Sequence, residues 1–209
     1  MSATYNRFAG QSLDRLAALS DGLFAIAMTL LVLDLRVPAS ELIRSEGALW
    51  NALVSLSPHF IPYLMSFLTL GIFWVAQQTQ LGQFQRSNRD LAWIHLGFLL
   101  SVSLIPFSTG LLSAFLTYRV ALLAYWVNIL LLGVWLYAGW RYGARAGLLR
   151  DDASGDVSRA TERRILAAQG LYALGALLCV INTYVSIAFI VLVQLNFVIA
   201  PRFLRLHRL

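Results

Sequence analysis

Side chains that could bind or move an ion gather at one end of an otherwise apolar stretch, RLAALSDGLFAIAMTLLVLDLRVP, at residues 15–38. Arg15, Ser20 and Asp21 open this stretch, and Thr29 is the one hydroxyl in the apolar run that follows. Polar groups inside a bilayer are costly and usually mark a functional site. A carboxylate attracts cations, and a hydroxyl oxygen can replace part of an ion's hydration shell. These residue types therefore mark the helix as a candidate functional site.

Residues that would support catalysis form no recognisable pattern. The three histidines, His59, His95 and His207, are far apart along the chain. The sequence has no HExxH or CxxC pair, no glycine-rich phosphate loop and no GxSxG elbow. We therefore expect a protein that is not an enzyme and that holds no resident metal or cofactor. Cys179 is the only cysteine, and we interpret it as a small core residue.

The composition indicates an integral membrane protein. Of the 209 residues, 59% are hydrophobic and only 12% are charged, whereas an ordinary soluble domain carries about 25% charged residues. The formal net charge of +6 could suggest nucleic acid as a partner. However, the arginines stand at the ends of hydrophobic segments, a placement that fits membrane topology and lipid headgroups. We therefore expect an all-α membrane protein with the lipid bilayer as its partner and no nucleic acid.

The hydrophobic segments predict six spans, because each transmembrane helix needs roughly 20 apolar residues. Pro106 should kink or loosen the end of the third span. The segment 40–57 is interpreted equally well as an interfacial helix or as an ordinary loop. We expect a single transmembrane domain over residues 1–209, with helices at about 14–36, 60–80, 89–113, 117–142, 164–181 and 185–203.

The arginines predict the orientation of the chain. Thirteen of the sixteen fall on one side of the predicted topology, and the other side has only Arg36, Arg44 and Arg119. Cytoplasmic loops carry the arginine excess in membrane proteins. We therefore expect a multi-pass protein of the cell inner (plasma) membrane, with both termini in the cytoplasm.

The first span has a polar position within an apolar stripe. At about 100° per residue, Ile26, Thr29 and Leu33 fall within one narrow sector of the helix. A packed helix also has an apolar stripe, and a lone threonine usually bonds its own backbone. Periodicity alone therefore leaves two interpretations open, pore lining and ordinary helix packing.

Three separate segments, in order, resemble the endolysosomal potassium channel family and its prokaryotic homologues. The segment RLAALSD at residues 15–21 is similar to the family's Arg-x-x-x-Phe-Ser-Asp signature at the start of helix one. GIFWVAQQ at 71–78 and LIPFSTGLL at 104–112 are similar to its second and third helices. Beyond these segments, the second half of the chain resembles the family only in hydropathy.

Two positions depart from the family pattern. Leu19 stands where the signature has phenylalanine, and it is a milder apolar filler. Gln77 and Gln78 stand where family members often have histidines after the tryptophan of helix two. Glutamine does not titrate, so pH sensing by those histidines is not expected in this chain.

The resemblance implies a potassium-selective cation channel, a homotetramer of six-helix subunits with helix one lining a central pore. By position, Ile26 and Leu33 become apolar rings at the constriction or gate, and Thr29 becomes a hydroxyl ring that contributes to selectivity. Potassium ions would bind only in transit. Proton conduction is the nearest alternative, because the family resemblance implies it too, and a secondary transporter is the alternative from another class.

The motif residues also have a structural interpretation. Asp21 lies too near the membrane to remain without hydrogen-bond donors. We expect a network that fixes helix one against its neighbours and includes Arg15, Ser20, Trp74, Trp93 and His95. In the alternative interpretation, Asp21 itself lines the inner mouth of the pore and attracts cations.

Overall fold

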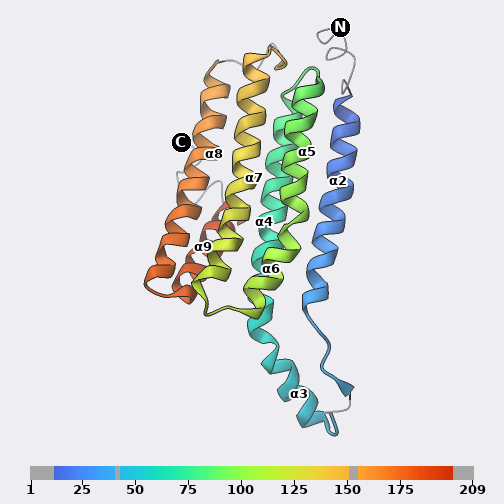
Figure 1. Ribbon diagram of the computed structural model, residues 1–209, viewed down its shortest axis with the longest axis vertical. Helices are drawn as coiled ribbons and strands as arrows, with labels where there is room; N and C mark the ends of the chain where they lie inside the picture. The colour runs from blue at the N-terminus through green and yellow to red at the C-terminus, as the bar shows by residue number, and fades with distance from the viewer. Residues whose placement is uncertain (1–11, 41–42, 151–154, 200–209) are drawn as a thin grey trace.

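The computed structural model describes residues 12–40, 43–150 and 155–199, and these ranges are mainly helical (Figure 1). Their only strand-like pairing is one isolated bridge, between Phe84 and Leu149. The helices, with two 3-10 turns marked η, are α2 (Leu13–Leu30), η1 (Leu31–Asp34), α3 (Glu46–Ser55), α4 (Ser57–Gly82), α5 (Arg89–Ser103), α6 (Ile105–Ala114), α7 (Arg119–Arg145), α8 (Gly155–Leu177), η3 (Leu178–Val180) and α9 (Thr183–Ile199).

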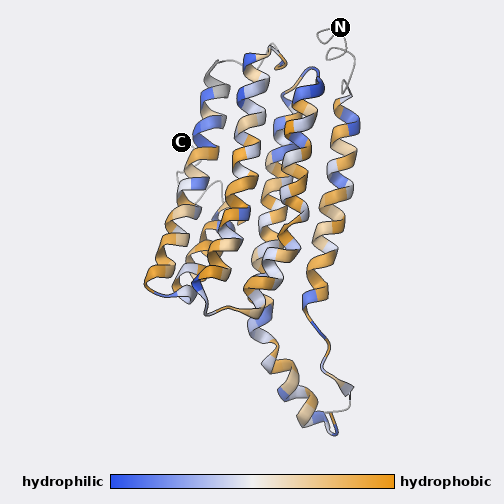
Figure 2. Ribbon diagram, viewed as in Figure 1, coloured by the Kyte–Doolittle hydropathy of each residue, from blue (hydrophilic) through white to orange (hydrophobic). Residues whose placement is uncertain are grey.

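The long helices run side by side as a bundle, with α2 at one edge and α8 at the other (Figure 1). The described chain contains five helices long and apolar enough to cross a membrane, while α9 is a shorter apolar helix of 17 residues. Apolar residues cover most of each long helix and hydrophilic ones gather near the ends (Figure 2). The protein is therefore an all-α, multi-pass membrane protein.

Short polar side chains begin three of the helices. Ser12, Ser45 and Asn88 each accept a hydrogen bond from the backbone N–H three residues further on, which satisfies a donor that the first turn leaves unpaired. The helix α4 begins at Ser57 rather than near residue 60, so Pro62 lies inside it. Pro62 has no N–H to donate to the carbonyl of Pro58, and its ring crowds that carbonyl.

The third span is broken in two where the sequence contains Pro106. The helix α5 ends at Ser103, and α6 begins at Ile105 with the proline in its first turn. Proline has no N–H to continue the α5 hydrogen-bond ladder, and its ring crowds the carbonyl four residues before it. The break therefore lies where the proline was expected to loosen the helix.

The segment between the first two spans forms a helix that stands away from the bundle. This helix, α3, projects beyond the end of the bundle (Figure 1), and none of its residues is buried. Trp50, Leu53 and Val54 are exposed on it. Of the two interpretations of residues 40–57, the helical one therefore agrees with the described structure.

At one end of the bundle, backbone hydrogen bonds tie two loops together. At the end where α7 stops, Gly147 adopts a positive φ of 62°, a conformation that glycine tolerates best. Two backbone hydrogen bonds then tie the following segment to the α4–α5 loop, from Gln85 N to Leu148 O and from Arg150 N to Gln83 O. The loop between α4 and α5 is thereby held against the end of α7.

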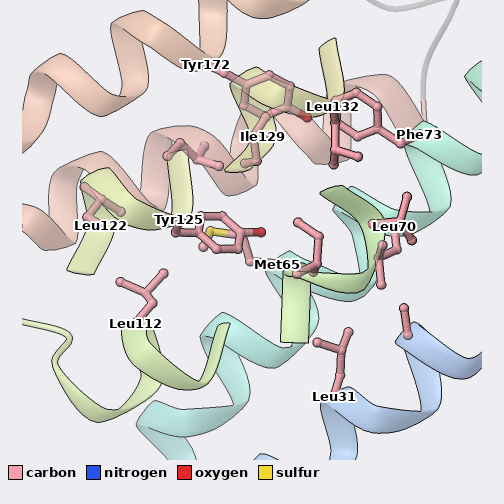
Figure 3. Close-up of a cluster of buried hydrophobic side chains, with 14 of the residues drawn as sticks. Leu31, Met65, Leu70, Phe73, Leu112, Leu122, Tyr125, Ile129, Leu132 and Tyr172 are labelled. Atoms are coloured by element: carbon pink, nitrogen blue, oxygen red, sulfur yellow. The ribbon is translucent and has the colours of Figure 1, made fainter. Parts of the chain in front are cut away.

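The core lies where α2 and the helices from α4 to α9 meet, and its largest side chains fill the space between these helices (Figure 3). Leu31 brings the end of α2 into contact with this core and is fully buried. Tyr125 is also fully buried, and its hydroxyl forms hydrogen bonds with Ser66 and Thr69 of α4. Burial of these apolar faces fixes which side of α2 faces inward.

Candidate functional site

The polar end of α2 packs against α4 and α5. Ser20 is completely buried there, whereas its neighbour Asp21 is exposed at the edge of the contact. The two residues are about 100° apart around the helix, so they meet different partners. Ser20 faces both α4 and α5, and Asp21 faces α4 alone.

The Ser20 hydroxyl is the centre of a buried hydrogen-bond cluster. It donates to the Leu16 carbonyl at 2.8 Å and accepts from Gln77 Nε2 at 3.2 Å. Its third partner is His95 Nε2, at 2.7 Å. Either the Ser20 hydroxyl or the imidazole Nε2 donates in this contact, depending on the tautomer of His95. The cluster joins α2, α4 and α5 through one oxygen.

The Asp21 carboxylate has two partners on α4. Its Oδ1 atom accepts hydrogen bonds from Trp74 Nε1 at 2.8 Å and from Gln78 Nε2 at 2.6 Å. Trp74 and Gln78 are four residues apart, so they lie on the same helix face. The carboxylate thus receives two neutral N–H donors, and both restrain the rotation of α2 against α4.

Not every residue of the expected network joins this cluster. Trp93 does not contact Asp21, and its side chain is 62% exposed. The reason is helical geometry: Trp93 and His95 are about 200° apart around α5, so only one of them can face α2. Arg15 is also exposed, and within the described residues its side chain makes no hydrogen bond or ion pair.

Gln77 and Gln78 are cluster members that the sequence interpretation overlooked. Both were treated only as positions where titratable histidines had been lost, yet both donate an amide N–H to the motif residues of α2. Their spacing from Trp74, three and four residues, was the available signal, because it places all three on one face of α4.

The opposite face of α2 is open. Ile26 is 58% exposed, and Thr29 is exposed as well. Leu33 lies in η1, which continues directly from α2, and it is 69% exposed. The buried positions of the same helix, Phe24 and Ala27, face the bundle. Since α2 lies at the edge of the bundle (Figure 1), this apolar face has no partner within the described chain.

The Thr29 hydroxyl is oriented by its own helix. It donates to the carbonyl of Ala25 at 3.0 Å and to that of Ile26 at 2.8 Å. A hydroxyl whose proton points to the backbone keeps its oxygen lone pairs free as acceptors. The side chain therefore presents an acceptor oxygen, rather than an O–H donor, on the open face of α2.

The described residues offer little else for chemistry. No three His, Cys, Asp or Glu side chains among them lie close enough to hold a metal ion. The arrangement consists instead of a helix with one face held by hydrogen bonds and one open face that is apolar except for Thr29. Such a helix can line a path for ions when several copies are brought together.

The fold and this arrangement define a multi-pass helical membrane protein of the ion-channel class. The sequence model described as "Endosomal/lysosomal potassium channel TMEM175" matches residues 15–106. A potassium channel of Streptomyces collinus is 33% identical over 200 residues, which cover 93% of this chain and 87% of the relative. This chain belongs to the TMEM175 family.

Three further matches extend the comparison. A potassium channel of Chamaesiphon minutus is 30% identical over 177 residues, covering 83% of this chain and 87% of the relative. The crystal structure of a lysosomal potassium-selective channel TMEM175 homologue from Chamaesiphon minutus superposes with a TM-score of 0.78 at 26% identity, covering 89% of this chain and 96% of that one. The bovine relative, named an endosomal/lysosomal proton channel, is 33% identical over 109 residues, covering 50% of this chain and 23% of that protein.

Proposed function

We propose that this chain is the subunit of a potassium channel in which α2 from each of four copies lines a central pore. The observation that carries the proposal is the open face of α2, with Ile26, Thr29 and Leu33 exposed on one side of a helix whose other side is buried. The bacterial relatives named above as potassium channels support the choice of ion.

The open face accounts for both assembly and permeation. A second copy of the chain is the occupant we expect, because the exposed apolar surface continues from α2 onto α4, where Leu64 and Phe67 are exposed. Around a central axis, Ile26 and Leu33 would each form a ring of apolar side chains. Such a ring can gate a pore by excluding water.

Thr29 accounts for ion preference. An ion that passes between two apolar rings loses hydration with nothing to offset the cost. A ring of Thr29 oxygens, each with free lone pairs, would recover part of that cost. The recovery favours the ion that loses water more cheaply, and this ion is potassium rather than sodium.

The cluster around Ser20 and Asp21 is assigned a positioning role. By holding the buried face of α2 against α4 and α5, it sets the rotation of the helix and hence the direction in which Ile26 and Thr29 point. The arginine distribution orients the subunit with both termini in the cytoplasm of a bacterial cell, in the plasma membrane. No catalytic step is part of this function.

A proton channel is the second candidate, because the vertebrate relatives are named as proton channels. Reversal potentials separate the two. The full chain is reconstituted into liposomes with potassium and sodium in opposed gradients, and then with a pH gradient alone. We expect currents that reverse near the potassium equilibrium potential and a small response to pH.

Two results would overturn the proposal. Currents that follow the proton equilibrium potential would assign the chain to proton conduction. Uptake that saturates and requires a counter-ion would assign it to the secondary transporters, since a channel needs no coupled ion. Liposomes without protein provide the leak control for both measurements.

A further inference from the structure

A surface cavity at the end of α7 combines cationic and aromatic side chains. Its volume is about 500 Å³, and it is lined by Tyr137, Ala138, Arg141, Tyr142 and Arg145. All five belong to α7, and they form two adjacent pairs and a single residue, each separated from the next by one helical turn, so they lie on one face of that helix. The cavity is distinct from the α2 face and from the cluster around Ser20.

One cation of this cavity is held in place by its neighbours. Arg141 Nη1 donates a hydrogen bond to the Tyr137 hydroxyl at 2.8 Å. Its guanidinium carbon lies 5.6 Å from the centre of the Tyr137 ring, and Glu162 of α8 lies 3.6 Å from Nη1. The Arg141 charge is therefore oriented, and Glu162 partly offsets it.

The other cation has no such partner. Arg145 is exposed, and within the described residues its side chain forms no hydrogen bond or ion pair. Asp90 does not line the cavity, but it accepts a hydrogen bond at 3.1 Å from the hydroxyl of Tyr142, which does. The positive charge available to a ligand thus comes mainly from Arg145, with further N–H donors from the oriented Arg141.

The position along α7 places these cations at the depth of lipid headgroups. The helix has 27 residues and so spans about 40 Å, whereas the hydrocarbon core of a bilayer is about 30 Å thick. With α7 across the membrane, its last turn extends into the headgroup layer. Arg145 lies in that turn, and Arg141 lies one turn deeper.

An apolar stripe continues from the cavity toward the other end of α7. Its residues share the cavity's helix face, are exposed and are separated by three or four positions: Val120, Leu123, Val127, Leu131 and Val134. A stripe of branched aliphatic side chains below two arginines matches the two parts of a phospholipid, acyl chains below a phosphate.

We propose that this cavity and stripe form a binding site for one anionic phospholipid, with the headgroup phosphate on Arg145 and Arg141 and an acyl chain along the stripe. Arginine suits the phosphate because its guanidinium offers several N–H donors in a plane. Clusters of basic side chains at the cytoplasmic surface attract anionic lipid headgroups. The site does not depend on which ion the channel conducts.

To test the proposal, the purified full-length protein in detergent is titrated with phosphatidylglycerol. Native mass spectrometry then counts the lipids bound to it. Arg145→Gln removes the unpaired charge from an exposed position, so the fold should be kept. We expect the affinity for the first phosphatidylglycerol to fall about fivefold, which is the contribution of one arginine near a membrane surface. Phosphatidylcholine, which has no net charge, should bind wild type weakly and should not distinguish the variant.

The matched control is Arg164→Gln, which removes an exposed charge of α8 that does not line the cavity. This variant should bind phosphatidylglycerol as wild type does. Equal binding by wild type and Arg145→Gln, or an equal loss in both variants, would overturn the proposal. Competition by glycerol phosphate as effective as that of the lipid would also overturn it, by showing a site for free phosphate. A changed oligomer mass in Arg145→Gln would instead assign this face to a contact between subunits.

Discussion

At the residue scale, the central feature is the use of a single serine hydroxyl to join three helices. Ser20 is buried and forms hydrogen bonds with Leu16, Gln77 and His95. We therefore propose that Ser20 positions α2 and that Thr29 presents an oxygen to permeating ions.

Substitutions at Asp21 separate positioning from permeation. Asp21→Asn keeps an oxygen that can accept from Trp74 and Gln78, whereas Asp21→Ala leaves both donors without that partner. We expect the alanine variant to be less stable than the asparagine variant by roughly 1 kcal/mol per chain in its free energy of unfolding. It should therefore unfold at a lower temperature. Thermal unfolding and size-exclusion chromatography in detergent measure this. Normal assembly of both variants with equal loss of current would place Asp21 in the ion path.

Thr29→Val isolates the hydroxyl oxygen, because valine keeps the shape of the side chain. We expect the potassium-to-sodium permeability ratio to fall toward one while the oligomer stays intact. Thr79→Val is the matched control, since Thr79 is also exposed and donates to the carbonyl four residues before it, but on α4. Reversal potentials under bi-ionic conditions give both ratios. An unchanged ratio in Thr29→Val would mean that the hydroxyl serves only its own helix backbone.

At the scale of elements, the contact between α7 and the α4–α5 loop depends on a residue without a side chain. A Cβ atom on Gly143 would collide with the ring of Phe84. Phe84 is buried and packs on Trp140, with ring centres 6.3 Å apart. The same loop carries the backbone bonds to the segment after α7, so this end of the bundle has little space to adjust.

Gly143→Ala should therefore destabilise the protein, by about 1–3 kcal/mol, as is typical when a well-packed site is overfilled. Gly170→Ala is the control, because Gly170 is exposed on α8 and has open space where a Cβ would lie. That substitution should be neutral or stabilising by up to about 1 kcal/mol through helix propensity. Denaturation of both variants in the same detergent gives the comparison. Equal stability of the two variants would mean that Phe84 relocates without cost.

At the scale of the whole molecule, the bundle leaves one edge helix half covered. The apolar face of α2 differs from the polar ends of the chain, so contact with water does not explain it. Contact with lipid alone would not explain the hydroxyl at its centre. Assembly of several copies around α2 explains both features. The oligomer is expected to have four times the 23.3 kDa mass of one chain.

The apolar rings of that assembly should limit conduction. Replacing Ile26 or Leu33 with Asn would wet the constriction, so we expect a larger single-channel conductance in both variants. Leu177→Asn is the control. Leu177 has a comparable exposure of 66%, but it lies on α8, far along the chain from the α2 face. Planar-bilayer recordings compare the three variants. Conductance equal to wild type in both α2 variants would move the constriction to another position.

The sequence by itself determined the membrane class, and it predicted the extent of the spans and a shared sector for Ile26, Thr29 and Leu33. Hydropathy and helical periodicity are local properties, because each span needs only its own run of apolar residues. The break at Pro106 is equally local, since proline disrupts the helix that contains it wherever that helix packs.

The tertiary structure decided which side chains meet. Trp74, Trp93 and His95 all carry an N–H group, so the sequence could not separate the donor of Asp21 from its alternatives. Only the rotation of α4 and α5 about their axes brought Trp74 and Gln78 to Asp21, placed His95 on Ser20 and left Trp93 exposed. That rotation follows from burial of the apolar faces around residues such as Leu31 and Tyr125, which depends on every neighbouring helix at once.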